Sequence, residues 1–206
     1  MIKLYGLRMS NYYSLVKAAM IEKGLAFEEV KAPPTQKEDN LARSPMGKMP
    51  SIEVDGQYIS ESLAIVSYLE RAYPETTLLP ADPVEAAKAL ELALHIKLDV
   101  ELAARRLLPA AMFGGSASDE LIETTRQEVT RGMQAVSQLM VCNPYAAGAE
   151  FGLADLYTYY SMGLASTIAQ KMFGSDLLAD YPQISELMTT LAARPSIAQV
   201  TTEAAT

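Results

Sequence analysis

The stretch Lys48-Met49-Pro50-Ser51-Ile52-Glu53-Val54-Asp55-Gly56, followed shortly by Ser60-Glu61-Ser62, decides the fold of this chain. It predicts a strand entered through a proline, an Asp-Gly hairpin turn, a second short strand and a helix that opens at Glu61 and Ser62. If the bond before Pro50 is cis, the backbone of Met49 can face an extended ligand. The free N–H groups and side-chain oxygens at the start of the helix suit an anion. Together, the proline-led edge and this anion site can hold a small peptide.

The residues before the hairpin complete an α/β layer. The order strand, helix, strand, short helix, hairpin, helix predicts a thioredoxin-like domain with a mixed four-stranded sheet over residues 1–74. Besides the hairpin, the expected elements are strands at residues 2–6 and 27–30 and helices at residues 12–23, 37–43 and 61–72.

A proline-rich segment separates this layer from the second half of the chain. Three prolines lie within residues 73–83, which predicts a linker at residues 75–83. Residues 84–206 carry helical periodicity without strand signals and predict an all-α helical bundle domain. Its expected helices are residues 84–108, stopped by Pro109; 119–140; 153–170; and 182–193, ended by Pro195.

Composition limits the function classes. A formal charge of −8 argues against nucleic acid as a partner, because phosphates need a basic surface. No apolar run is long enough to span a membrane, and the first residues lack a signal-peptide pattern, so no membrane partner and a cytoplasmic location are expected. With Cys142 as the single cysteine and His95 as the single histidine, no internal disulfide and no metal site are expected. A bound anion would need local cations, and the candidates are Arg8, Lys17, Lys37 and Lys48.

Ser10 is well placed for chemistry, since it follows the first strand at the start of the first helix. Its hydroxyl can donate a hydrogen bond to an anion that also feels the positive end of the helix. A thiolate suits this place: a charge-assisted hydrogen bond of about 1.5–3 kcal/mol and a dipole contribution of about 0.3–1 kcal/mol would lower a thiol pKa by about one to two. Two alternatives stay open. Ser10 serves only as an N-cap, or the hydroxyl of Tyr12 or Tyr13 is the donor.

These features together resemble a known family. The matching residues are Leu4-Tyr5-Gly6, Ser10, Gly47-Lys48-Met49-Pro50, Asp55-Gly56, Glu61-Ser62-Leu63-Ala64-Ile65, Tyr68-Leu69 and Leu78-Leu79-Pro80. With the helical second half, they are similar to the cytosolic glutathione S-transferases, of a serine-type or an unclassified bacterial-like class. The resemblance implies an enzyme of detoxification that activates the thiol of glutathione, its co-substrate, for attack on a small hydrophobic electrophile, with no other cofactor and no metal.

The resemblance also implies site residues. Ser10 would be the catalytic hydroxyl, and Met49, before a cis Pro50, would pair its backbone with the cysteinyl part of glutathione. At the γ-glutamyl end, Glu61 would pair with the α-ammonium and Ser62 would donate to the α-carboxylate. The residues implied at the glycyl carboxylate are Lys48, with Gln36 or Lys37.

The electrophile pocket is expected between the domains. The residues implied there are Met9, Tyr12, Arg105, Met112 and Phe113. Met112 and Phe113, with the glycines that follow, form either a mobile lid or an ordinary interhelical loop. The resemblance further implies a homodimer, in which Asp99 is similar to an acidic residue that reaches glutathione across the subunit interface.

Several alternatives keep the same fold. They are a non-catalytic glutathione- or ligand-binding protein, a protein-interaction protein, and a glutathione-dependent isomerase, dehalogenase or peroxidase. A thiol–disulfide oxidoreductase is disfavoured, because no cysteine lies in the loop before the first helix.

Overall fold

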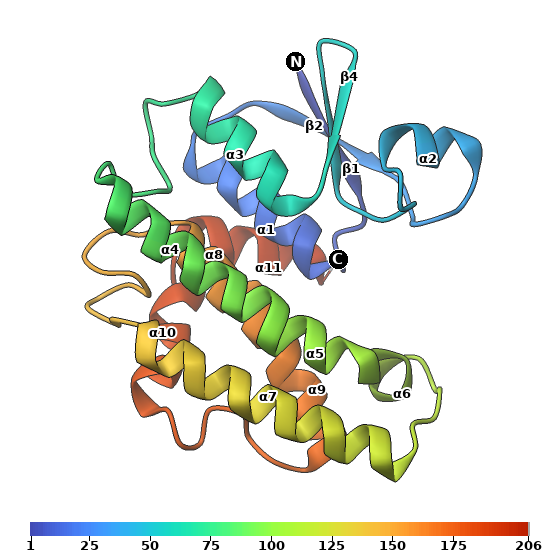
Figure 1. Cartoon of the computed structure of the whole chain (residues 1–206). Coiled ribbons are helices and arrows are strands. Elements are labelled where there is room, and N and C mark those ends of the chain that lie inside the picture. Colours follow the sequence, from blue (N-terminus) through green and yellow to red (C-terminus); the bar gives the residue numbers. More distant parts are fainter. Residues whose placement is uncertain (206) are drawn as a thin grey trace. The chain divides into compact units, whose positions relative to one another are not determined.

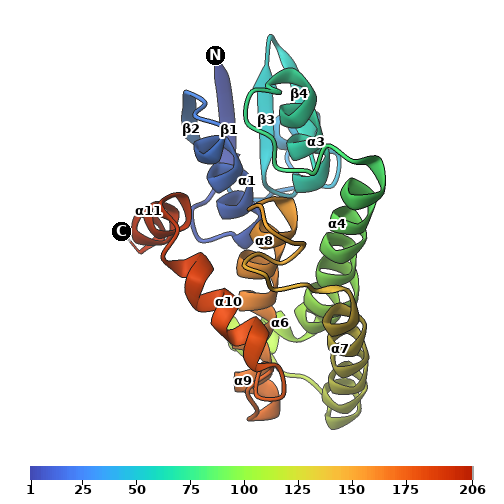
Figure 2. The same cartoon turned by 90° about the vertical axis from the view of Figure 1, so that its left-hand side faces the viewer.

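A computed structural model describes residues 1–205, which form two compact units (Figures 1 and 2). The first unit comprises Met1–Leu78 together with the segment from Ala193 onward, and the second comprises Leu79–Ala192. The helical unit thus ends at Ala192 and does not run to the end of the chain, because the last helix packs against the first unit. Within residues 1–205, no helix has the length and apolarity needed to cross a membrane.

The N-terminal unit is built on a four-stranded mixed sheet in the order β2-β1-β3-β4. Strand β1 is parallel to β2 and antiparallel to β3, and β3 and β4 form the Asp-Gly hairpin. This topology confirms the thioredoxin-like layer. The elements are β1 (Ile2–Gly6), α1 (Asn11–Glu22), β2 (Phe27–Lys31), α2 (Glu38–Arg43), β3 (Ser51–Val54), β4 (Gln57–Ser60), α3 (Ser62–Ala72) and α11 (Pro195–Ala204).

The core of this unit lies between the sheet and the two helices α1 and α3. Alternate residues of a strand point to one face, so β1 buries Ile2 and Leu4, and β3 adds Ile52 on the same face. The helices α1 and α3 pack against each other and supply the rest of the core. Their fully buried apolar side chains are Leu15, Val16, Ala18, Ala19, Met20, Ile65, Val66 and Leu69.

Helix α11 was not expected, because Pro195 was interpreted only as the end of the preceding helix. Pro195 instead begins α11, where its missing N–H would have had no partner within the helix. Charged groups fix α11 to α1. Arg194 donates from Nε and Nη2 to the two carboxylate oxygens of Glu22, each at 2.7 Å, and the buried Lys17 pairs with Glu203. The last helix therefore belongs to the N-terminal unit.

The second unit is all-helical, as expected. The predicted helix from residue 84 runs past Pro109 to Met112, because Pro109 lies in the first turn of α6 and not at a helix end. Helices α4 and α7 lie side by side (Figure 1). The elements are α4 (Pro83–His95), the π-helical η1 (Ile96–Glu101), α5 (Leu102–Ala104), the 3₁₀-helical η2 (Arg105–Leu107), α6 (Leu108–Met112), α7 (Asp119–Leu139), α8 (Leu153–Tyr157), the π-helical η3 (Thr158–Met162), α9 (Gly163–Phe173) and α10 (Pro182–Ala192).

Gly132 sets the close approach of α7 to η1. A Cβ atom at Gly132 would lie 2.3 Å from the carbonyl oxygen of Asp99 and 2.7 Å from its carbonyl carbon. These are backbone atoms, which cannot move aside as the end of a flexible side chain can. The absence of a side chain at Gly132 therefore fixes where the backbone of Asp99 lies.

Replacing Gly132 by alanine is expected to destabilise the protein by about 1–3 kcal/mol, because overpacking outweighs the gain of about 1 kcal/mol in helix propensity. Urea unfolding of the purified variant measures the change. Gly163→Ala is the matched control, since a Cβ there would contact only Met188 Cε, at 3.7 Å. A Gly132→Ala protein as stable as Gly163→Ala would contradict the close packing.

Candidate active site

Three predicted segments meet at one end of the sheet. Tyr5 is paired with Ser51 in the β1–β3 register, and Ser51 is paired with Ser60 in the β3–β4 register. The loop after β1, the residues before β3 and the residues after β4 therefore leave three adjacent strands at the same end. The structure thus brings the loop that carries Ser10 to the same place as the residue pairs around Pro50 and Glu61.

Ser10 is the N-cap of α1. Its Oγ accepts a hydrogen bond from the backbone N–H of Tyr13 at 3.4 Å, and its own N–H donates to the carbonyl of Leu7 at 3.0 Å. An N-cap uses a lone pair of the hydroxyl, and its proton can still be donated to an anion. The capping role and the proposed chemical role of Ser10 are therefore compatible.

Tyr13 has a defined role of its own. Its side chain is 2% exposed, and its hydroxyl donates to Glu29 Oε2 at 2.6 Å. Burial, followed by the hydrogen bond to Glu29, raises the pKa of Tyr13. The ring lies against Gly6, where a Cβ would come within 2.4 Å of Tyr13 Cδ2. The hydroxyl of Tyr13 is thus committed to Glu29, whereas Tyr12, the other tyrosine named from the sequence, is half-buried in the first turn of α1.

Two of the four candidate cations are engaged by Glu29. Arg8 Nη2 lies 2.8 Å from Glu29 Oε1, and Lys17 Nζ lies 2.7 Å from the same oxygen. The interpretation of Arg8 and Lys17 as cations for a ligand is therefore corrected, because each is paired within the protein. The exposed Lys37 and Lys48 keep that role as candidates.

Glu29 was not identified from the sequence as part of the site, although its position in the strand indicated an inward-facing carboxylate. Glu29 lies on the same face of β2 as Phe27, and in the β1–β2 register it is opposite the buried Leu4. Burial opposes its ionisation, but hydrogen bonds from Arg8, Lys17 and Tyr13 outweigh that effect and lower the pKa of Glu29 to about 2. A carboxylate in an inward position of a strand requires such partners.

The lowered pKa of Glu29 predicts how stability depends on pH. The pKa of Glu29 is about 2 in the folded protein and 4.5 ordinarily. The ionised Glu29 therefore contributes fully to the unfolding free energy above pH 4.5, and this contribution is lost as pH falls toward 2. Between about pH 5 and pH 2, the unfolding free energy of the wild type should therefore fall more steeply than that of Glu29→Gln. Urea unfolding across this range measures both slopes, and equal slopes would contradict the prediction.

The segment before β3 is held against the loop before α2. The Met49-Pro50 bond is cis, and Pro50 is buried. Gly47 has φ 64°, and a Cβ there would lie 2.5 Å from both the Thr35 carbonyl oxygen and Gln36 Nε2. Thr35 N–H donates to the Gly47 carbonyl at 3.1 Å, and Gln36 Nε2 donates to the carbonyl of Met46 at 3.2 Å. Gln36 is thus brought against the segment that continues into Lys48, and Lys37 follows it as the N-cap of α2.

Glu61 and Ser62 form the start of α3. Glu61 is the N-cap with φ 71° and ψ 120°, and Ser62 is the first helical residue, 3% exposed. A residue other than glycine in the left-handed region costs about 1–3 kcal/mol and is typical of functional sites. The Glu61 side chain makes no hydrogen bond that caps the helix. Its unfavourable backbone conformation is therefore not explained by helix capping.

The remaining predicted residues lie in different surroundings. Asp99 Oδ2 is 2.6 Å from His95 Nδ1 on the exposed side of α4 and η1. Arg105 Nε lies 2.5 Å from Glu101 Oε1, and because Glu101 is fully buried, Arg105 neutralises an internal carboxylate. The exposed apolar side chains are Met9, in the first unit, and Met112 and Phe113, in the second. No cluster of His, Cys, Asp and Glu within the described residues could hold a metal ion.

A thioredoxin-like layer with a cis proline before β3, followed by an all-helical unit, defines a two-domain class of protein, and comparisons with known proteins identify it. Residues 4–77 match the family model described as the N-terminal domain of glutathione S-transferase. A glutathione S-transferase of Pseudomonas putida is 38% identical, over 97% of this chain and 91% of its own length. This chain belongs to the glutathione S-transferase family.

Two further relatives bear on the fold and the chemistry. A crystal structure of a glutathione S-transferase from Rhodospirillum rubrum F11 has a TM-score of 0.79 and 27% identity, and the match covers 97% of this chain and 91% of that one. A maleylacetoacetate isomerase of Pseudomonas aeruginosa is 29% identical over 96% of this chain and 94% of its own length.

Proposed function

We propose that this protein is a glutathione transferase that activates the thiol of glutathione for attack on small hydrophobic electrophiles. The observation that carries the proposal is the meeting of Ser10, the Met49-Pro50 pair and Glu61 with Ser62 at one end of the sheet. Membership of the glutathione S-transferase family supports glutathione as the ligand of this site.

In this proposal Ser10 stabilises the thiolate. The thiol of glutathione loses its proton to solvent, and the Ser10 hydroxyl donates a hydrogen bond to the resulting sulfur anion at the positive end of α1. The thiolate then attacks the electrophilic carbon, which forms the thioether and releases the leaving group. Tyr13 is less suitable as the donor, because its hydroxyl is buried and already donates to Glu29. Tyr12 is the remaining rival.

The other residues orient the tripeptide. Glu61 pairs with the α-ammonium group, Ser62 donates to the α-carboxylate at the start of α3, and the backbone of Met49 pairs with the cysteinyl residue. A helix N-terminus with a neighbouring carboxylate suits a zwitterion, because it offers donors and an anion together. The residues proposed at the glycyl carboxylate are Lys48, Gln36 and Lys37.

The electrophile is assigned to exposed apolar side chains. The residues proposed to contact the electrophile are Met9, Met112 and Phe113, all of which are exposed. A role in detoxification within the cytoplasm fits this chemistry, since that compartment keeps thiols reduced.

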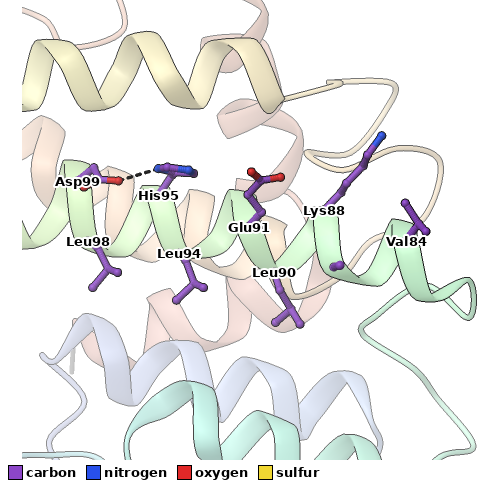
Figure 3. Close-up of a pocket in the computed structure, with 9 residues that line it drawn as sticks. Val84, Lys88, Leu90, Glu91, Leu94, His95, Leu98 and Asp99 are labelled. Carbon is purple, nitrogen blue, oxygen red and sulfur yellow. Dashed lines mark hydrogen bonds and ion pairs between the residues drawn. The ribbon is translucent and has the colours of Figure 1, made fainter.

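We further propose a homodimer formed through α4 and η1. A groove of about 590 Å³ lies along this helical segment. In Figure 3, Leu90, Leu94 and Leu98 project from one edge of the segment, and His95 and Asp99 project from the other. Leu94 and Leu98 are 38% and 47% exposed, which is unusual for a row of leucines on one helix face. A second copy related by a two-fold axis would cover this row and place Lys88 of one subunit near the acidic side chains of the other.

The double substitution Leu94→Glu/Leu98→Glu is expected to convert a dimer into a folded monomer, because buried carboxylates without partners oppose association. Sedimentation equilibrium measures the mass, and circular dichroism checks that the helices remain. Val141→Glu is the control, since Val141 is 55% exposed in a loop of the same unit. A wild type that sediments as a monomer would contradict the assembly.

The enzymatic proposal is tested by assaying conjugation of aryl halides and other electrophiles with glutathione, together with glutathione binding by calorimetry. Turnover with at least one electrophile is expected. Binding without turnover of any of them would favour a glutathione-binding protein.

The isomerase relative favours a second candidate function, glutathione-dependent isomerisation of maleylacetoacetate. The same bound thiolate would add to the double bond, permit rotation and leave again. A spectrophotometric isomerase assay with and without glutathione decides between the two reactions, because isomerisation regenerates glutathione and conjugation consumes it.

A further inference from the structure

We infer that Glu29 is a positioning residue, whose carboxylate holds the loop carrying Ser10 from both sides so that the Ser10 hydroxyl meets the thiolate. The inference rests on the proposed function, since it concerns the hydroxyl that acts on the glutathione thiol. It concerns the N-terminal unit only, and Glu29 itself has no contact with the ligand in this proposal.

The contacts of Glu29 bracket Ser10 along the chain. Two residues before Ser10, Arg8 donates from Nε to Oε2 at 3.2 Å and from Nη2 to Oε1 at 2.8 Å. Three residues after Ser10, Tyr13 donates its hydroxyl to Oε2 at 2.6 Å. One carboxylate on β2 therefore fixes the chain on both sides of the proposed catalytic hydroxyl.

Other contacts also restrain the loop. Arg8 is exposed, Met9 is 70% exposed, and the capping bond from Tyr13 N–H to Ser10 Oγ is long, at 3.4 Å. Besides the Ser10–Leu7 turn, the loop is held by Ser14, whose Oγ donates to the Arg8 carbonyl at 3.1 Å. The bidentate pair with Glu29 anchors the loop through the Arg8 side chain, whose Nη2 also lies 3.8 Å from Glu203 Oε2.

The charges around Glu29 are balanced. The groups that face it are Arg8 from the loop, Tyr13 and Lys17 from α1, and Glu203 from α11, which also pairs with Lys17. Arg8 and Lys17 are cations, and Glu29 and Glu203 are anions, so the cluster adds little net charge near Ser10. Loss of the Glu29 charge alone would leave Arg8 and Lys17 less neutralised, which favours a nearby thiolate and would lower the thiol pKa. A higher thiol pKa after loss of Glu29 would therefore report a change of geometry, and misplacement of a catalytic group by about 1 Å can cost about 100-fold in rate.

The test compares Glu29→Gln with Glu22→Gln. Glu22 is the matched control, because it also joins α1 to a cation, Arg194, but at the opposite end of the helix from Ser10. The readout is the pKa of the thiol of bound glutathione, from the ultraviolet absorbance of the thiolate across pH. Glu29→Gln is expected to raise this pKa by about one and to lower kcat/KM about tenfold, with the Kd for glutathione unchanged.

Glu22→Gln is expected to lose stability and leave the thiol pKa at the wild-type value. Arg8→Ala removes only the anchor before Ser10, so it should raise the thiol pKa even if Glu29→Gln fails to fold. Tyr13→Phe combined with Glu29→Ala should be no worse than Glu29→Ala alone, since each substitution removes the hydrogen bond between Tyr13 and Glu29. The positioning role would be overturned if the losses in kcat/KM of the two substitutions add in the double variant. It would also be overturned if Arg8→Ala and Glu29→Gln both keep the wild-type thiol pKa.

Failure of the proposed function looks different. A wild type that binds glutathione without any thiolate absorbance contradicts the activation of the thiol by this protein. A wild type that ionises the thiol, with Glu29→Gln and Arg8→Ala ionising it equally well, overturns the role of Glu29 alone.

Discussion

Replacing Ser10 by alanine is expected to lower kcat/KM for glutathione conjugation about 100-fold, the usual effect of removing one preorganised donor from a developing anion. The Kd for glutathione should change little, because Glu61, Ser62 and Met49 are proposed to hold the tripeptide. Steady-state kinetics and calorimetry on the same preparation separate the two quantities.

The loss of a helix cap must be distinguished from the loss of a catalytic hydroxyl. Ser118 offers the control, since it caps α7 as Ser10 caps α1, with its side chain accepting from Leu121 N–H at 3.2 Å. Both Ser10→Ala and Ser118→Ala should lose about 1 kcal/mol of stability. Only Ser10→Ala should lose activity. An active Ser10→Ala beside an inactive Tyr12→Phe would move the role to Tyr12.

The pH profile gives an independent signature of the same role. Wild-type kcat/KM should rise with an apparent pKa well below the ordinary thiol value of about 8.5, since the Ser10 hydroxyl is proposed to favour the thiolate. In Ser10→Ala the apparent pKa of this profile should increase toward the ordinary thiol value of about 8.5. The variant would then recover much of its activity in alkaline solution, where glutathione ionises without help.

Local sequence signals predicted the elements of the fold but not every boundary. The hairpin follows from Asp55 and Gly56, and α1 follows from its capping serine, because these depend on residues close in sequence. The wrongly predicted helix ends are those assigned to prolines, since a proline can end one helix or begin the next. Pro109 and Pro195 both lie in first turns, and only the packing of the following residues decides that a helix continues there.

The candidate site shows the same division between local and distant determinants. Ser10, the Met49-Pro50 pair and Glu61 could be proposed from the sequence, because each is set by the strand or helix beside it. The pairing of Glu29 with Arg8 and Lys17 depends on the parallel register of β1 and β2, which adjacent residues do not encode. For that reason Arg8 and Lys17 were interpreted as ligand cations, although both are internal partners.

Replacing Glu61 by glycine is expected to weaken glutathione binding and to stabilise the protein at the same time. Loss of the charge-assisted contact proposed for Glu61, of about 1.5–3 kcal/mol, would raise Kd about 10- to 100-fold. Glycine also relieves the left-handed backbone at φ 71°, which costs a residue with a side chain about 1–3 kcal/mol. Glycine also raises the conformational entropy of the unfolded chain, which lowers stability by about 0.4–1 kcal/mol. When this cost is subtracted from the relief of strain, the unfolding free energy should rise by about 1 kcal/mol.

Asp55→Gly is the matched control for Glu61→Gly. Asp55 is also a non-glycine residue with positive φ, at 50°, but it lies in the hairpin turn at the opposite end of β3 and β4 from Glu61. Asp55→Gly should keep the wild-type Kd, and Glu61→Gln should weaken binding without a gain in stability, because it keeps the strained backbone. If Glu61→Gly loses stability together with affinity, Glu61 supports the fold and its conformation is not maintained for the ligand. If stability rises while affinity falls, the strain at Glu61 is retained because it presents a carboxylate to the γ-glutamyl end of glutathione.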